Sequence, residues 1–345
     1  MIASKSIFDK ALDILVLMGG PSTEREVSLV SGRAVADVLE ACGHRVRRKD
    51  ISPEDLSAFE GPRPDVVFIA MHGAFGEDGQ VQRLCEQRGL PYVGSAPKAS
   101  ATAMDKAAAK AAYRSGGLNT PDWAVLTGGD TPARRKEALA RIGLPCALKP
   151  VDGGSSVDVS LVTTATARKA AIELLLGKYG KALLEPLIRG RELTVGVLGE
   201  QALPPVEIRP KGDFYDYAAK YINDDTEYLF EYGLDAATVQ RLQAAALGAH
   251  RVLGCRDLSR SDFILDGAGA AWLLETNTIP GFTSHSLLPK SAARIGIPMP
   301  RLCEMLVKMA LDRGCAQPVW LACPKAAQAM QKAEPAAEIK LAATR

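Results

Sequence analysis

The stretch SRSDFILDGAGAAWLLETNTIPG (259–281) predicts two strands joined by a glycine-containing turn. Asp262 and Glu275 are equidistant from the centre of that turn, so the hairpin would place the two carboxylates opposite each other. Like charges in this arrangement destabilise a sheet. Asn277 shares a face with Glu275 because side chains along a strand alternate between its two faces. The segment therefore predicts either a solvated acidic face or an oxygen-rich site for a cation.

Two carboxylates and an amide suit a hard cation such as Mg²⁺, which would remove the repulsion and usually binds together with a phosphate. A second segment, KPVDGGSSV (149–157), has a lysine at a strand end, followed by two glycines and two hydroxyls. Glycines allow backbone amides to approach phosphate oxygens closely, and a nearby lysine supplies charge. The segment lacks the spacing of a P-loop, so an ordinary hairpin turn remains an alternative interpretation.

The first hundred residues alternate apolar strands with amphipathic helices. DILVLMGG, PDVVFIAMHG and PYVG predict three buried strands, and STEREVSLVSGRAVADVLEACG predicts a helix after the first of them. Thr23 and Glu26 have the spacing of a capping box at the start of that helix. Strands that alternate with helices predict an α/β fold with a parallel, doubly wound sheet. Ligands would then bind at the carboxyl ends of the strands, where GGPSTERE and HGAFGEDG lie.

The pattern changes near residue 100, which predicts three domains and a tail. Residues 101–188 contain an alanine-rich helix and short strands, with a hairpin around VDGGSS. Residues 189–315 contain further strands, a polar loop, a long helix and the acidic hairpin. Residues 316–345 are rich in Ala, Lys and Glu and are broken by Pro, so we expect a loosely ordered and dispensable tail.

The composition argues against several classes of protein. At 345 residues the chain suits two or three domains, and a net charge of +2 with interleaved acids and bases disfavours a nucleic-acid surface. No segment approaches the roughly 18 continuous apolar residues of a membrane helix. Seven cysteines without a CxxC pair are typical of buried thiols in a reducing cytoplasm. The first strand is not followed by GxGxxG, which disfavours a dinucleotide-dependent oxidoreductase.

Single charged residues could serve a phosphate site or simply face solvent. Lys106 and Lys220 lie in loop or glycine contexts, and a nucleotide triphosphate beside Mg²⁺ needs several cations. Arg260 precedes the first acid of the hairpin by two residues, so its guanidinium could stabilise phosphoryl or oxyanion charge. Glu24 would lie in the first turn of a helix, where the helix dipole favours a carboxylate. His72 follows a buried strand and is either functional or bonded to the backbone.

Together these segments resemble the D-alanine–D-alanine ligases of the ATP-grasp superfamily. The resemblance runs from about residue 12 to residue 312 and rests on seven motifs in the family order: GGPSTEREVSL, HGAFGEDG, MDK, LKPVDGGSSV, FYDYAAKY, SRSDF and ETNTIPGFTSHS. It implies an α/β ATP-grasp fold with an N-terminal Rossmann-like domain (1–100), a central lid domain (101–188) and a C-terminal catalytic domain (189–315). It also implies a cytoplasmic homodimer whose partners are ATP and two molecules of D-alanine.

The resemblance implies a nucleotide site on particular residues. Glu185 would read the adenine amino group, and Glu192 would contact the ribose. Asp262, Glu275 and Asn277 would hold two Mg²⁺ ions, with Mn²⁺ as a possible substitute. The triphosphate would be bound by lysines and by the hairpin loop that folds over it: Lys106, Lys149, Lys220, Gly154 and Ser156.

The resemblance also implies an amino-acid site. Glu24 would grip the ammonium of the first D-alanine, near His72. Ser155 and Tyr221 would complete a hydrogen-bonded triad with Glu24. Arg260 and the backbone amide of Gly281 would form the oxyanion site. Ser286 and Leu287 would take the carboxylate of the second D-alanine.

The implied reaction is ATP-dependent synthesis of D-alanyl-D-alanine, a peptidoglycan precursor, through an acyl phosphate of the first D-alanine. Two departures lie in the phosphate loop, where Gly153 replaces the usual acid and Asp158 the usual glycine; the charge of Asp158 would oppose the triphosphate. Pro186 also replaces a commoner lysine. Alternatives are a ligase that takes D-lactate, D-serine or a wider range of second substrates, and a nucleotide-binding regulator without turnover.

Overall fold

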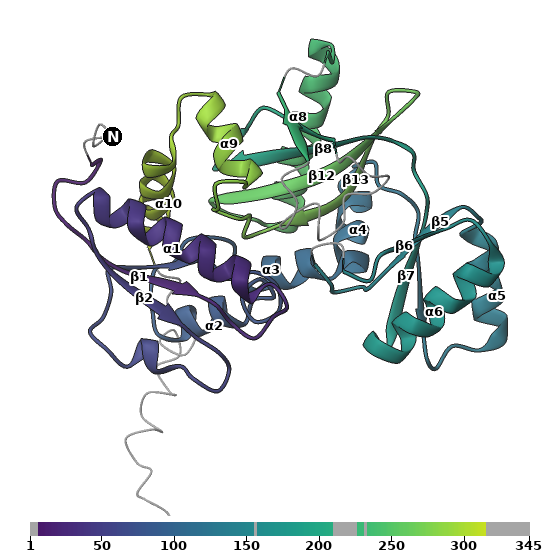
Figure 1. The fold of residues 1–345 in the computed structure, drawn as a ribbon, viewed down its shortest axis with the longest axis horizontal. Helices are drawn as coiled ribbons and strands as arrows, with labels where there is room; N and C mark the ends of the chain where they lie inside the picture. The colour runs from purple at the N-terminus through teal and green to yellow at the C-terminus, as the bar shows by residue number, and fades with distance from the viewer. Residues whose placement is uncertain (1–5, 155–156, 210–225, 231–232, 315–345) are drawn as a thin grey trace, which may run out of the picture.

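The computed structural model describes residues 6–154, 157–209, 226–230 and 233–314. The tail expected at 316–345 lies outside these ranges. Three sheets follow one another along the chain, and the largest lies between the other two (Figure 1). In the described part of the chain, no helix is long and apolar enough to cross a membrane.

The first sheet is parallel, as the alternation of strands and helices predicts. Its strands have the order β2-β1-β3. The central strand and one neighbour are almost wholly apolar and buried, which explains why the sequence pattern identifies them. The elements of this part are β1 (Asp13–Met18), α1 (Arg25–Ala41), β2 (Arg45–Asp50), a 3₁₀ turn (Ser57–Phe59), β3 (Val66–Ile69), α2 (Gln80–Gln87) and α3 (Pro97–Met104).

Two local predictions in this part are wrong. The capping box does not form, because α1 begins at Arg25 with Glu24 as its N-cap and no side chain caps it. PYVG contributes a single parallel bridge, between Val67 and Tyr92, in place of a full strand. In place of PYVG, the sheet contains β2, RVRRKD, whose polar side chains suit the sheet edge that it occupies.

The second sheet is antiparallel and has the order β4-β7-β5-β6, with two helices beside it (Figure 1). The predicted hairpin around VDGGSS is confirmed, because β5 and β6 pair antiparallel on either side of this loop. The elements of this part are α4 (Lys106–Ser115), β4 (Ala124–Thr127), α5 (Pro132–Arg141), β5 (Cys146–Lys149), β6 (Ser160–Val162), α6 (Ala165–Tyr179) and β7 (Lys181–Pro186).

The third sheet has the order β11-β10-β8-β12-β13, with β9 paired to β8. The predicted hairpin is formed by its last two strands. Asp262 is paired with Glu275 as predicted, although the register shifts by one residue between Asp262 and Phe263. The elements of this part are β8 (Gly190–Leu198), β9 (Gln201–Ala202), β10 (Val206–Arg209), β11 (Glu227–Leu229), α8 (Ala236–Leu253), β12 (Leu258–Asp266), β13 (Ala271–Asn277), α9 (Leu287–Arg294) and α10 (Met299–Arg313).

Two helices pack outside the sequence region to which we assigned them. Tyr113 of α4 is buried in the core of the third sheet with Leu242 of α8. Leu306 of α10 lies in the same apolar core as Ile14 of β1 and Leu39 of α1. Helices therefore cross between regions of the chain: α4 packs on the third sheet, and α10 packs on the first. Burial of their apolar side chains holds the sheets that form the walls of the site.

Candidate functional site

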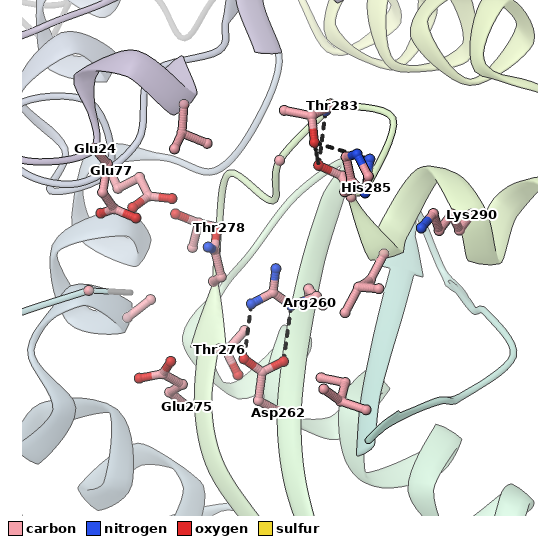
Figure 2. A pocket seen from close by; sticks show the side chains of 18 of the residues that line it. Glu24, Glu77, Arg260, Asp262, Glu275, Thr276, Thr278, Thr283, His285 and Lys290 are labelled. Carbon is pink, nitrogen blue, oxygen red and sulfur yellow. Dashed lines mark hydrogen bonds and ion pairs between the residues drawn. The ribbon is translucent and has the colours of Figure 1, made fainter. Parts of the chain in front are cut away.

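The acidic hairpin forms the floor of a cavity. Arg260 holds Asp262 with two hydrogen bonds, Nε to Oδ1 at 3.0 Å and Nη2 to Oδ2 at 2.9 Å (Figure 2). The Thr194 hydroxyl donates to Asp262 Oδ1 at 2.6 Å. Arg260 is thus oriented by the carboxylate beside it, as expected for residues two apart on one strand.

The second acid of the hairpin is compensated by a different cation. Lys106 Nζ lies 3.2 Å from Glu275 Oε2 and also donates to the carbonyl of Gly153 in the hairpin loop. Asn277 Oδ1 accepts a hydrogen bond from the backbone of Ile279 at 2.8 Å. Each of the opposed carboxylates therefore has a cation beside it, which reduces the repulsion that the sequence predicts.

The donor atoms at this place fit a hard cation. Asp262, Glu275 and Asn277 offer oxygen only, which suits Mg²⁺. Across the described ranges, no group of three His, Cys, Asp or Glu side chains is arranged to hold a metal ion. An ion here would therefore need further oxygens from water or from a phosphate, as Mg²⁺ sites with few protein ligands do.

Two cavities meet at the acidic hairpin. The first has a volume of about 780 Å³ and the second about 770 Å³. Both are lined by the same six residues: Lys106, Gly153, Gly154, Ile208, Asp262 and Glu275. A group bound in one cavity can therefore react with a group bound in the other beside two carboxylates, a lysine and a glycine loop.

The second cavity lies between the second and third sheets. Apolar side chains from both sheets line it, including Val157, Leu161 and Ile188 from one side and Ile264 and Leu274 from the other. A slot of this kind suits a flat aromatic ring, which gains from burial between two apolar surfaces. The expected ribose contact, Glu192, also lines this cavity.

Charged groups close the inner end of the second cavity. Lys149 Nζ lies 2.6 Å from Glu185 Oε2, and both residues line the cavity. Burial alone would raise the pKa of Glu185, but Lys149 and Lys110 outweigh burial and hold it below its usual value. Burial likewise would lower the pKa of Lys149, but Glu185 and Glu275 together outweigh burial, and the pKa is raised. All three groups are therefore charged at neutral pH.

Lys110 is a residue that our sequence reasoning missed. Its ammonium lies 2.8 Å from Glu185 Oε1, behind the residues that line the second cavity. The signal was present in the sequence, because Lys110 follows Lys106 by one helical turn in the segment KAAAK and so lies on the same helix face. An alanine-rich helix with lysines at this spacing is more often solvated, so only packing distinguishes the two cases.

The first cavity has two carboxylates at one end. Glu24 and Glu77 are 7% and 8% exposed, and both line the cavity (Figure 2). Both approach Gly73: its backbone N–H donates to Glu77 Oε2 at 2.7 Å, and a Cβ there would lie 2.9 Å from Glu24 Oε2. Glu24 is equally close to Gly154 of the hairpin loop, where a Cβ would lie 2.8 Å from Oε2. The loop from the second sheet thus packs directly against the acid at the start of α1.

Glu77 is the second residue that our sequence reasoning missed, although it lies within the motif HGAFGEDG. Its Oε1 atom is buried and makes no hydrogen bond. His72 Nδ1 lies 3.8 Å from Glu77 Oε1. A buried carboxylate oxygen of this kind in a cavity wall is suited to receive a ligand cation.

His72 lies behind the wall of the first cavity. Its Nδ1 contacts the carbonyl of Ile279 at 3.0 Å, and its Nε2 contacts the hydroxyl of Ser31 at 2.9 Å. The carbonyl can only accept, so Nδ1 carries the proton, and Nε2 accepts from the Ser31 hydroxyl in the neutral ring. These contacts match the backbone-bonded interpretation and join the loop after β3 to the segment after β13.

The opposite end of the first cavity is formed by the segment before α9. Gly281, Ser286 and Leu287 all line it. A Cβ on Gly281 would lie 2.6 Å from Ser286 Oγ, so a larger residue here would have to displace the Ser286 side chain. Ser286 Oγ also accepts a hydrogen bond from the backbone of Thr283 at 2.9 Å (Figure 2). A helix start of this kind favours an anion.

Four expected site residues, Ser155, Ser156, Lys220 and Tyr221, lie outside the described residues. Asp158, beside the first pair, does not point at the second cavity. It accepts hydrogen bonds from Tyr179 and from Lys178, the latter at 2.6 Å, and these contacts lower its pKa. Its φ of 55° falls in the left-handed region, which explains why a glycine would be usual at this position.

Comparison with known proteins agrees with this geometry. Sequence models described as the D-ala D-ala ligase N-terminus and C-terminus match residues 49–95 and 113–308. A D-alanine–D-alanine ligase from Anaeromyxobacter dehalogenans is 42% identical over 85% of this chain and 95% of that one. One from Xanthomonas axonopodis pv. citri is 46% identical over 82% and 90%.

Solved structures agree as well. The D-alanine–D-alanine ligase from Bacillus anthracis complexed with ATP superposes with a TM-score of 0.77 at 30% identity, covering 88% of this chain and 98% of that one. The VanG D-Ala:D-Ser ligase from Enterococcus faecalis gives a TM-score of 0.77 at 29% identity, covering 87% and 100%. The motifs, the three sheets, the paired cavities and these likenesses all lead to one conclusion: the chain belongs to the D-alanine–D-alanine ligase family, with its α/β ATP-grasp fold.

Proposed function

We propose that this protein joins two D-alanines into D-alanyl-D-alanine at the expense of ATP, through an acyl phosphate of the first D-alanine. The observation that carries the proposal is the meeting of two cavities at Lys106, Asp262 and Glu275. One cavity has an apolar slot with lysines at its inner end, and the other has carboxylates at one end and a helix start at the other. This arrangement suits phosphoryl transfer from a nucleotide to a small zwitterion.

On the nucleotide side, adenine would lie in the apolar slot, with its amino group near Glu185 and its ribose near Glu192. Lys149 and Lys106 would bind the phosphates, together with the amides of Gly154 and the Ser156 hydroxyl. Lys220 would reach the γ-phosphate. Lys106 already bridges Glu275 and the carbonyl of Gly153, so its ammonium lies where the transferred group would pass.

Asp262, Glu275 and Asn277 would hold two Mg²⁺ ions, or Mn²⁺ in their place. The ions would neutralise negative charge on the triphosphate during transfer. Arg260 and the amide of Gly281 line the first cavity, where they would stabilise the oxyanion of the tetrahedral intermediate. A carboxylate is a poor electrophile, so activation as an acyl phosphate gives the second amine a leaving group to displace.

On the amino-acid side, Glu24 and Glu77 would hold the ammonium of the first D-alanine, with His72 fixing the loop behind them. The carboxylate of the second D-alanine would bind at Ser286 and Leu287. Its ammonium must lose a proton before it attacks. Ser155 and Tyr221 would form the route for that proton through their hydrogen bonds to Glu24.

The product, D-alanyl-D-alanine, would serve as a precursor of peptidoglycan and so support the cell wall and cell shape. We propose that the protein works in the cytoplasm, where the precursor is assembled, and that it acts as a homodimer. We also propose three functional domains at residues 1–100, 101–188 and 189–315, the second acting as a lid over the nucleotide. The mixed packing of α4 and α10 would join these domains through shared cores.

A second candidate is a ligase that takes D-serine or D-lactate as its second substrate. The likeness to the D-Ala:D-Ser ligase from Enterococcus faecalis supports this alternative as well as the first. The two functions would share the nucleotide site and the first amino-acid site. They would differ only where the second substrate binds.

Phosphate release from ATP tests the proposal. With purified protein, Mg²⁺ and ATP, we expect phosphate release that depends on D-alanine and yields D-alanyl-D-alanine by mass spectrometry. L-alanine serves as the matched control. Release only when D-serine or D-lactate is added with D-alanine would favour the second candidate, and no D-alanine-dependent release under any condition would refute both.

A further inference from the structure

Lys110 is a fully buried lysine that neither cavity wall includes. The side chain is 0% exposed. Its ammonium donates to the Thr120 hydroxyl at 2.7 Å and to the carbonyl of Pro121 at 3.3 Å, and lies 2.8 Å from Glu185 Oε1. It also lies 5.9 Å from the centre of the Trp123 ring. A buried ammonium is costly unless several partners compensate it, so this arrangement is specifically built.

The charges around Glu185 do not balance one to one. Lys149 approaches one carboxylate oxygen at 2.6 Å, and Lys110 approaches the other at 2.8 Å. With Lys149 alone, the pair would be neutral, and the lysine that lines the nucleotide cavity would have its charge cancelled. With Lys110 present, the three groups carry a net charge of +1. Glu275, whose charge also acts on Lys149, is itself paired with Lys106.

We propose that Lys110 is a positioning residue that offsets the charge of Glu185, so that Lys149 presents an effective positive charge to the phosphates of ATP. The proposal deepens the proposed function, because it assumes that ATP binds in the second cavity. Lys110 acts without touching the nucleotide. It reaches Glu185 from α4, which packs in the core of the third sheet, whereas Glu185 and Lys149 come from β7 and β5 of the second sheet. The way the two sheets meet therefore sets the charge of the site.

The protonation of Lys110 gives the proposal a pH dependence. Burial lowers the pKa of Lys110 to about 8; Glu185 raises it in part, and Lys149 and Arg114 lower it further. These are the charged groups that face the ammonium, from β7, β5 and its own helix. As the pH rises through about 8, Lys110 loses its proton and the net charge of the cluster falls by one.

The contribution of Lys110 to the free energy of unfolding should rise with pH, whereas ATP affinity falls. The pKa of Lys110 falls from 10.5 to about 8 on folding, so between these values the unfolded chain binds more protons than the folded one. The contribution of this group to stability therefore rises with pH across that window. Between about pH 8 and 10.5, ATP affinity should therefore fall while the contribution of Lys110 to the free energy of unfolding rises. A loss of ATP binding caused by alkaline unfolding would not show this combination.

The test compares ATP binding by wild type and Lys110→Met, measured by calorimetry with Mg²⁺ at a series of pH values. Met keeps the length of the side chain and removes its charge. At pH 7 we expect roughly tenfold weaker binding of ATP, within the usual range for coupled sites, and a smaller loss for AMP, which carries fewer phosphates. The terminal phosphate of ATP has a pKa of about 6, so it is deprotonated above pH 7 and its charge does not change over the range tested. Wild-type affinity for ATP should fall across about pH 8, and Lys110→Met should lack that transition.

Two further variants sharpen the test. Lys169→Met removes an exposed lysine of α6, 80% exposed and outside both cavities, and should bind ATP as wild type does. In a Glu185→Gln background the charge that Lys110 offsets is gone, so Lys110→Met should cost much less than in wild type. Equal losses in the two backgrounds would overturn the proposal.

Wild-type ATP affinity that is constant from pH 7 to pH 9.5 would overturn the proposal even if Lys110→Met fails to fold, since that arm uses the native protein. Unchanged affinity and pH dependence in a folded Lys110→Met protein would do the same. A protein that binds ATP but does not ligate D-alanine would refute the proposed function and leave this inference standing.

Discussion

Replacing Glu77 by Gln should weaken binding of the first D-alanine without weakening the fold. Glu77 Oε1 is buried without a hydrogen bond, and Oε2 accepts from the Gly73 backbone at 2.7 Å. Gln keeps an oxygen for the Gly73 amide and replaces the other, charged oxygen with an NH₂ group. The substitution therefore removes the charge that would bind the substrate ammonium and preserves the contact that orders the loop.

Glu77→Gln should weaken D-alanine binding but should not lower the free energy of unfolding. A charge-assisted hydrogen bond contributes about 1.5–3 kcal/mol, so the Michaelis constant of the first D-alanine should rise roughly ten- to 150-fold. A carboxylate that is only 8% exposed is costly to bury without a full set of partners. Removing its charge should therefore change the free energy of unfolding by between zero and a gain of about 1 kcal/mol.

The measurement is phosphate release at saturating ATP over a wide range of D-alanine concentrations, which separates the two D-alanine sites. The Michaelis constant for ATP should stay within about twofold of wild type, because Glu77 does not line the second cavity. Glu86→Gln is the matched control: it makes the same chemical change on α2, at a residue that accepts a hydrogen bond from Tyr92 and lines neither cavity.

Unchanged D-alanine kinetics in Glu77→Gln would refute the assignment of Glu77 to the substrate ammonium. A loss of more than about 1 kcal/mol in unfolding free energy would refute the electrostatic argument. That result would mean that the carboxylate is compensated in the folded protein, most directly by His72, whose Nδ1 lies 3.8 Å from Oε1.

Three other outcomes are expected. Glu275→Gln should abolish ligation while the protein stays folded, because one lost anionic ligand unbalances the Mg²⁺ site; wild-type turnover at saturating Mg²⁺ would contradict this. Asp158→Gly should leave ATP affinity within about twofold and unfolding free energy within about 1 kcal/mol, because relief of left-handed strain offsets the lost contacts with Lys178 and Tyr179; clearly tighter ATP binding would show that its charge does reach the phosphates. Tyr221→Phe should gain D-alanyl-D-lactate synthesis with a roughly three- to tenfold change in selectivity, the value of one hydrogen bond, in competition assays from about pH 6 to 9; an identical product ratio for both proteins would remove this residue as the discriminator.

The sequence determined the features that depend on local geometry. The hairpin around DGAGA predicts that Asp262 and Glu275 face each other, and the structure pairs them through a one-residue register shift between Asp262 and Phe263. Buried apolar runs alternating with a helix predict the parallel first sheet. Family motifs also identify residues such as Arg260, in the first half of β12, and Gly281, in the loop after β13, which line one cavity.

Only the tertiary structure decided which charges meet. Lys110, Lys149 and Glu185 come from three separate elements, and nothing local distinguishes a buried lysine of an alanine-rich helix from a solvated one. Asp158 belongs to the phosphate loop by sequence but binds the end of α6. The physical reason is that the energy of a charge depends on its burial and on partners distant in sequence, whereas strand pairing and hydrophobic periodicity follow from neighbouring residues.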